Sequence, residues 1–134
     1  MKTNLIGLLL AGAVVLPLAA HHSFDAEYDR NKQRDFEGVV TKVEWMNPHA
    51  RFYINVKDEK GTLTNWNLEL ASPNALVRRG WTRKSLNVGE EVTVEGSLAR
   101  DGSKMANARV VTLANGRQVF AGSSGGDDPP PPAR

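Results

Sequence analysis

The chain's three histidines, His21, His22 and His49, are the residues whose placement most directly suggests chemistry. If the chain is cut after Ala20, His21 becomes the first residue and carries two nitrogen donors, its α-amine and its imidazole. These two donors form a chelate ring, and a third nitrogen from His49 would complete the T-shaped set called a histidine brace. Tetragonal nitrogen coordination suits Cu(II), and copper heads the affinity order of the divalent ions. The α-amine has an ordinary pKa of about 7.7–8, so a metal displaces its proton readily near neutrality.

Other side chains near these histidines offer further ligands. His22 adds a second imidazole, and the Met46 thioether would favour Cu(I). Asp25 and Glu27 are candidate oxygen ligands, or acceptors that orient an imidazole. Zinc held by the same histidines is the alternative metal. The non-metal interpretation is also open, since two terminal histidines are often solvated and a histidine in an Asn-Pro-His turn often bonds the loop backbone.

The first 20 residues have the pattern of a secretory signal peptide. Lys2 supplies a positive charge, an apolar stretch follows, and Pro17 and Ala20 provide a break and a small residue before the cut. The apolar stretch is short for a membrane span, which needs about 20 residues. The chain has no cysteine, and so no lipid-attachment residue. We therefore expect a periplasmic or secreted protein without a membrane anchor after cleavage.

Composition narrows the remaining classes. A chain of 134 residues predicts one small domain. The formal charge of +2 falls to about +1 without Lys2, which is too weak a field to predict nucleic-acid binding. The chain has no Gly-x-Ser-x-Gly elbow, cysteine nucleophile, phosphate loop or His-Glu-x-x-His helix, so we do not expect an enzyme.

Period-two alternation from Phe36 onward predicts an all-β domain. We expect an N-terminal arm at 21–35, a barrel at 36–121 and a disordered Gly/Ser/Pro tail at 122–134. The expected strands are 39–45, 51–57, 63–70, one within 86–96, 106–113 and a short edge strand at 119–120. A two-turn helix over 74–79 has Ser72 as N-cap and Gly80 after its end. This order predicts a small OB-like Greek-key barrel of five or six strands with one helix between strands three and four. A small open sandwich is the alternative.

The alternation also predicts which residues face inward. Val39, Val43 and Trp45 share one face of the first strand, and Trp66 falls on the inner face of the third. Tyr53, Asn65, Asn67 and Glu69 fall on the outer faces of the second and third strands, where an OB barrel has its groove. These four residues predict the second candidate function, a metal-free envelope module for a peptide, an oligosaccharide or a partner protein. Simple solvent exposure explains them equally well.

Several short motifs together resemble a known family. They are His21-His22-Ser23-Phe24-Asp25-Ala26-Glu27-Tyr28-Asp29, Asn47-Pro48-His49-Ala50, Asn65-Trp66, Ser72-Pro73-Asn74, Arg79-Gly80-Trp81 and Met105-Ala106-Asn107-Ala108. In these motifs the chain resembles a family of small exported bacterial proteins of unknown function, from His21 to about Ser124. The resemblance implies the compartment and an OB-like fold. It brings no activity.

Overall fold

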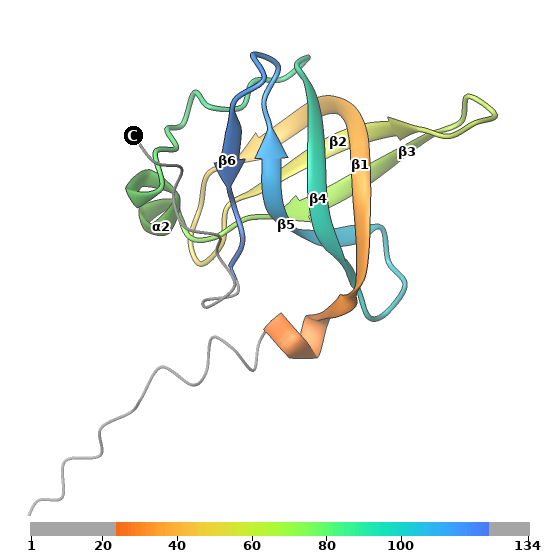
Figure 1. Cartoon of the computed structure of the whole chain (residues 1–134), viewed down its shortest axis with the longest axis horizontal. Helices are drawn as coiled ribbons and strands as arrows, with labels where there is room; N and C mark the ends of the chain where they lie inside the picture. The colour runs from red at the N-terminus through yellow and green to blue at the C-terminus, as the bar shows by residue number, and fades with distance from the viewer. Residues whose placement is uncertain (1–23, 124–134) are drawn as a thin grey trace, which may run out of the picture.

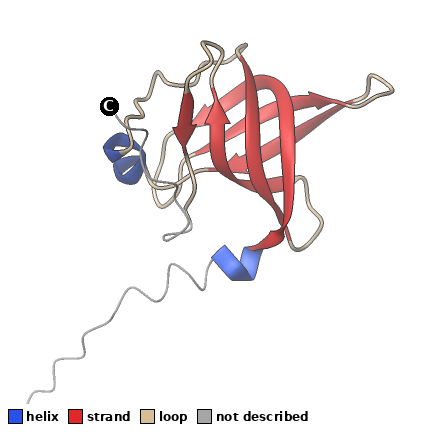
Figure 2. Ribbon diagram, in the orientation of Figure 1, coloured by secondary structure: helices blue, strands red, loops and turns tan. Residues whose placement is uncertain are grey.

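The computed structural model describes residues 24–123, which form a six-stranded sheet rolled into a barrel with a short helix beside it (Figure 1). A helical turn at 24–27 precedes the first strand. The elements are β1 Tyr28–Glu44, β2 Arg51–Lys57, β3 Leu63–Glu69, α2 Pro73–Arg78, β4 Glu91–Ala99, β5 Met105–Thr112 and β6 Gln118–Phe120. Strand is the dominant structure of this part of the chain (Figure 2).

The long strand β1 is shared by both halves of the barrel, because it pairs on both of its edges. Its C-terminal half runs antiparallel to β2, and its N-terminal half runs antiparallel to β4. The ring closes where β3 pairs in parallel with β5 at Asn67, Leu68 and Glu69. The order β3-β2-β1-β4-β5, with a helix between β3 and β4, is that of an OB-type barrel. The predicted fold class is confirmed, and the closing pair excludes the open sandwich.

A glycine lies where β1 changes partners. Gly38 pairs with Val56 on one side and Val92 on the other. A Cβ at this position would lie 2.5 Å from the backbone oxygen of Asn55. Glycine is therefore required here by the close approach of two strands.

The first strand differs from the prediction in two ways. It begins at Tyr28 instead of near Phe36, so residues 28–35 of the expected arm are strand. Residues 29–35 all carry polar side chains and show no alternation, and their strand conformation depends on the backbone pairing of Tyr28 and residues 33–35 with β4. The inward residue is Val40, which is 1% exposed, whereas Val39 is 37% exposed. A register shift between Val40 and Lys42 reverses the alternation, and such an extra residue moves later side chains to the other face.

The remaining elements follow the predicted pattern closely. β2 has the predicted bounds, and Phe52, Ile54, Trp66 and Leu68 are all buried. The core continues under α2, where Trp81 is 2% exposed and its indole nitrogen donates to the Phe120 carbonyl.

The helix α2 has the predicted caps. The Ser72 hydroxyl accepts a hydrogen bond from the Ala75 amide at 3.3 Å, and Pro73 is the first helical residue. Gly80 has the positive φ of 91° that favours glycine after a helix end. Among residues 24–123, no helix is long and apolar enough to cross a bilayer.

Candidate functional site

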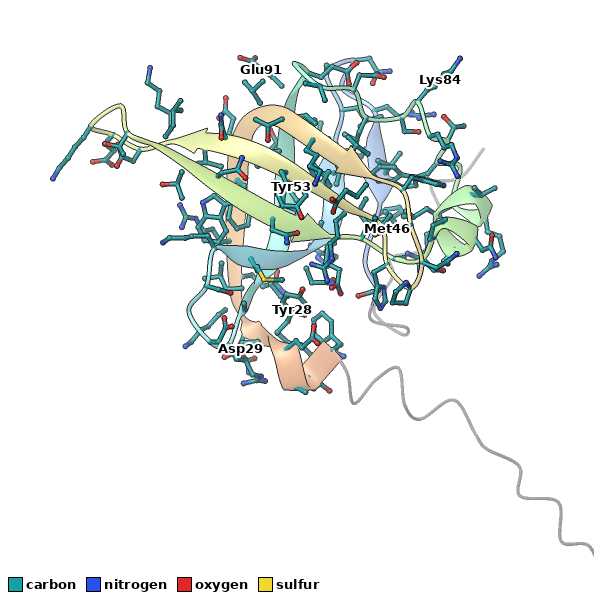
Figure 3. All side chains as sticks on the ribbon, turned by 180° about the vertical axis from the view of Figure 1, so that it is seen from behind. Tyr28, Asp29, Met46, Tyr53, Lys84 and Glu91 are labelled. Atoms are coloured by element: carbon teal, nitrogen blue, oxygen red, sulfur yellow. The ribbon has the colours of Figure 1, made fainter. Side chains whose placement is uncertain are left out.

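A pocket of about 560 Å³ lies between the N-terminal helical turn and the β4–β5 loop. This volume lies within the range of pockets that hold small organic ligands. Figure 1 shows this turn and this loop at the same end of the barrel. Figure 3 shows Tyr28 and Asp29 at this end of the barrel, beside the helical turn. The lining residues are Ala26, Glu27, Tyr28, Arg51, Ala99, Arg100, Asp101, Ser103 and Met105.

A buried carboxylate organises the wall of this pocket. Glu69 is 4% exposed, and its Oε2 accepts hydrogen bonds from the Tyr28 hydroxyl at 3.1 Å and from Arg51 Nη2 at 2.6 Å. Its other oxygen accepts a hydrogen bond from the Asn107 side-chain amide at 3.2 Å, and that amide also donates to the Ser123 hydroxyl. The cross-strand pair Arg51–Glu69 of β2 and β3 places the two charges opposite each other. Glu69 therefore links the start of β1, three strands and the C-terminal segment.

Burial, and then the negative charge of Glu69, raise the pKa of the Tyr28 phenol well above its ordinary value. Burial disfavours the phenolate because it removes water from the charge. Because the neutral phenol keeps its proton, it can donate a hydrogen bond to the Glu69 carboxylate. This bond holds the start of β1 against the barrel.

Arg100 ties the helical turn to the β4–β5 loop. Its backbone amide donates to the Glu27 carbonyl at 2.9 Å, and its Nε donates to the Asp25 carbonyl at 2.7 Å. Its guanidinium also lies 3.7 Å from the Asp29 carboxylate. These contacts cross 75 residues of sequence between Asp25 and Arg100. One wall of the pocket therefore comes from the helical turn and another from the β4–β5 loop.

Asp101 lies on the rim of the pocket, in the turn after β4. The nearby side chain and backbone amide of Ser103 lower the pKa of this carboxyl, and the amide donates to Asp101 Oδ1 at 2.9 Å. Asp101 therefore stays ionised at neutral pH. Neither Asp101 nor Glu27 forms an ion pair with a cation inside the segment 24–123.

The predicted metal ligands that the structure describes, His49 and Met46, do not line this pocket. His21 and His22 lie outside the described residues, so the histidine brace stays a prediction. His49 is half-buried in the β1–β2 loop, and its Nδ1 is buried with no hydrogen-bond partner among residues 24–123. Met46 is 51% exposed in the same loop. No group of three His, Cys, Asp or Glu side chains in this part of the chain is arranged to hold a metal.

The four predicted groove residues share one face of β2 and β3. Tyr53 is directly opposite Asn67, and Arg51 is opposite Glu69, so these positions are neighbours along the sheet. The Tyr53 hydroxyl donates to Glu44 at 3.2 Å, and Asn65 donates to Asn55 at 2.9 Å. Figure 3 shows Tyr53 over the sheet, away from Tyr28.

Glu69 differs from the other predicted groove residues because it is only 4% exposed and its carboxylate accepts hydrogen bonds from Tyr28, Arg51 and Asn107. These contacts are those of a buried structural acid.

Sequence reasoning missed most of the pocket. Tyr28 comes from the predicted arm, Arg100 and Ser103 come from the stretch between two predicted strands, and no periodicity connects these segments. Arg51 could have been found, because the Asp58–Gly61 turn sets a hairpin register that places it opposite Glu69. The rest of the pocket depends on how the barrel closes.

The closed ring, the helix between β3 and β4 and the pocket beside the β4–β5 loop define the class: a small OB-type β-barrel domain. Within that class, the chain belongs to the Family of unknown function (DUF6152), whose family model matches residues 9–108. No curated protein and no solved structure matches the chain.

Proposed function

We propose that this protein is an exported, metal-free binding module that holds a short peptide in the pocket between the helical turn and the β4–β5 loop. The observation that carries the proposal is the position of the pocket. It lies beside the start of β2 and the β4–β5 loop, where OB barrels take their ligands. Export rests on the signal-peptide pattern of residues 1–20.

The charges in the pocket indicate which peptide would bind. Arg51 is engaged by Glu69, and Arg100 is engaged by Asp29 and the Asp25 carbonyl. The carboxylates of Glu27 and Asp101 have no such partners among residues 24–123. The pocket thus offers a ligand two negative charges, and a lysine or arginine side chain complements them.

The uncharged part of the lining supports a peptide over an oligosaccharide. Met105, Ala26 and Ala99 give the pocket an apolar surface, which suits aliphatic side chains. Sugar rings commonly stack on an open aromatic face. The one aromatic side chain in the lining, Tyr28, is only 1% exposed. An oligosaccharide is therefore the weaker fit.

A peptide titration tests this function. The mature chain is titrated with the peptides Ala-Lys-Ala-Met and Ala-Glu-Ala-Met, with and without a metal chelator. We expect the lysine peptide to bind better and the chelator to have no effect. The double variant Glu27→Gln/Asp101→Asn should bind the lysine peptide at least tenfold more weakly, and Glu59→Gln, in the β2–β3 turn, should bind normally. Equal binding of both peptides, or a loss with chelator, would contradict the proposal.

A copper site is the second candidate, and one observation favours it. The buried, unpartnered Nδ1 of His49 is a donor atom whose desolvation has no compensating bond among the described residues. His21 with its α-amine, His49 and additionally His22 would hold the ion, and Met46 would add a thioether for Cu(I). Copper suits this nitrogen set, with zinc as the alternative. The role would be metal handling or delivery.

Two measurements test the copper candidate. Mass spectrometry of the secreted chain must find His21 at the N-terminus. The electron paramagnetic resonance spectrum of the Cu(II)-loaded chain should then change in His49→Ala, while Met46→Leu should leave it unaltered. Any other N-terminus, or identical spectra for His49→Ala and the parent chain, would rule out this site.

A further inference from the structure

Two cations converge on one aromatic ring at a surface separate from the pocket. The Arg34 guanidinium carbon lies 5.0 Å from the centre of the Trp66 ring, and Lys104 Nζ lies 5.2 Å from the same ring. Arg34 also lies 5.2 Å from the centre of the Phe36 ring. Both cations are on exposed residues. Their side chains cover the Phe36–Trp66 pair, and the indole face attracts each charge.

Within residues 24–123, neither Arg34 nor Lys104 forms an ion pair with an acidic group. Two like charges over one ring repel each other, and the repulsion is relieved when an anion binds between them. A carboxylate is a suitable anion, because charge-assisted hydrogen bonds to arginine and lysine are among the strong ones.

The same surface has an open strand edge. β3 pairs with β5 only at Asn67, Leu68 and Glu69, so residues 63–66 have no strand on that side. The Asn67 amide donates to the Lys104 carbonyl at 3.0 Å, which shows that this amide points away from β2. Strand hydrogen bonds alternate in direction, so the amides of Asn65 and Leu63 point to the open side as well. The β2–β3 hairpin projects beyond the rest of the barrel and leaves this edge accessible (Figure 1).

We propose that an extended acidic peptide segment of a partner adds to β3 along residues 63–66 and places a carboxylate between Arg34 and Lys104. The strand edge supplies main-chain hydrogen bonds, and the two cations select an acidic side chain. The charge complementarity identifies the occupant: a basic segment would be repelled, and a neutral one would leave both cations unpaired. This surface lies outside the pocket lining, so the proposal does not depend on the peptide pocket.

The test uses a nine-residue peptide of alternating threonine and valine with one central glutamate. The isotope-labelled chain is titrated with it, and backbone amide signals are followed by NMR. We expect the Leu63 and Asn65 amides to shift and to become protected from hydrogen exchange. A peptide with glutamine at the centre should bind at least tenfold more weakly, and so should the double variant Arg34→Gln/Lys104→Gln. The matched double variant Arg83→Gln/Lys84→Gln, which removes two exposed cations elsewhere, should bind normally.

Two further titrations distinguish a strand-addition site from a simple anion site. A peptide with N-methylated backbone amides on one edge should lose binding, and sodium phosphate alone should bind more weakly than the glutamate peptide. Equal affinity of the N-methylated peptide, or of phosphate, would overturn strand addition. Unchanged affinity in Arg34→Gln/Lys104→Gln would overturn the role of the cations. If that variant unfolds, two other measurements test the role of the cations. They are the affinity of Lys104→Gln for the glutamate peptide and the affinity of the parent chain for the glutamine peptide.

Discussion

The Tyr28 hydroxyl donates a 3.1 Å hydrogen bond to the Glu69 carboxylate and so joins the first residue of β1 to the last residue of β3. The bond spans 41 residues. It holds the N-terminal segment over the barrel end and gives the pocket a fixed wall. We therefore expect both partners to affect the stability of the fold, each in a way that can be measured.

Replacing Glu69 with alanine should strongly destabilise the fold. The change leaves the Arg51 guanidinium without its carboxylate and removes an acceptor from Tyr28 and Asn107. Breaking a largely buried pair from one side costs about 3 kcal/mol of unfolding free energy, which urea denaturation measures. Glu95→Ala, which breaks the more exposed pair with Arg109, should cost less than about 1 kcal/mol. Equal losses in the two variants would show that Glu69 is not a central contact.

Tyr28 should make the stability fall at alkaline pH. Tyrosine in the unfolded chain ionises near pH 10, whereas burial and Glu69 raise the pKa of Tyr28 in the folded protein. Above about pH 10 the unfolded chain therefore loses a proton that the folded chain keeps, so stability falls by up to about 1.4 kcal/mol per pH unit. Below that pH the contribution is fully present.

The comparison with Tyr28→Phe isolates this effect. Urea denaturation of both chains between pH 7 and 11 should give a constant stability difference up to about pH 9. The difference should shrink above pH 10, because phenylalanine cannot ionise. Parallel curves throughout would mean that Tyr28 ionises as easily in the folded chain as in the unfolded one.

Gly38→Ala should destabilise the barrel through a steric clash. The new Cβ would lie 2.5 Å from the Asn55 backbone oxygen, so β1 and β2 must separate. Overpacking of this kind costs about 1–3 kcal/mol. Gly102→Ala is the control, since it has open space around its Cβ and only the strain of a φ of 77°. Thermal and urea unfolding should show the larger loss of stability in Gly38→Ala. The reverse order would be inconsistent with a close approach of β1 and β2 at Gly38.

Arg100→Ala should loosen the helical turn at 24–27. It removes the bonds to the Asp25 carbonyl and the Asp29 carboxylate, while the Arg100 backbone amide still reaches the Glu27 carbonyl. Hydrogen exchange at the Tyr28 amide should rise about tenfold, the effect of losing one charge-assisted bond. Exchange at Val94, in the barrel wall, should be unchanged. Arg117→Ala, an exposed cation at the β5–β6 turn, should alter neither amide, and an equal rise there would refute the anchoring role of Arg100.

Local patterns determined most of the elements. The alternation of Phe52, Ile54, Trp66 and Leu68 predicted β2 and β3, and Ser72 with Gly80 predicted the ends of α2, because these signals act within a few residues. The same patterns placed the groove residues Tyr53 and Asn67 on one outer face. The predicted site on the histidines remains a prediction, since His21 and His22 lie outside the described residues.

The tertiary structure alone decided the pocket and the true first strand. The start of β1 becomes strand because Tyr28 and residues 33–35 pair with β4, and those partners lie 60 or more residues away. The bulge after Val40 reverses which valine enters the core, and no local signal marks it. Tyr28, Arg100 and Glu69 meet only when the barrel closes, because burial and charge pairing act through space between segments that alternation along the chain cannot connect.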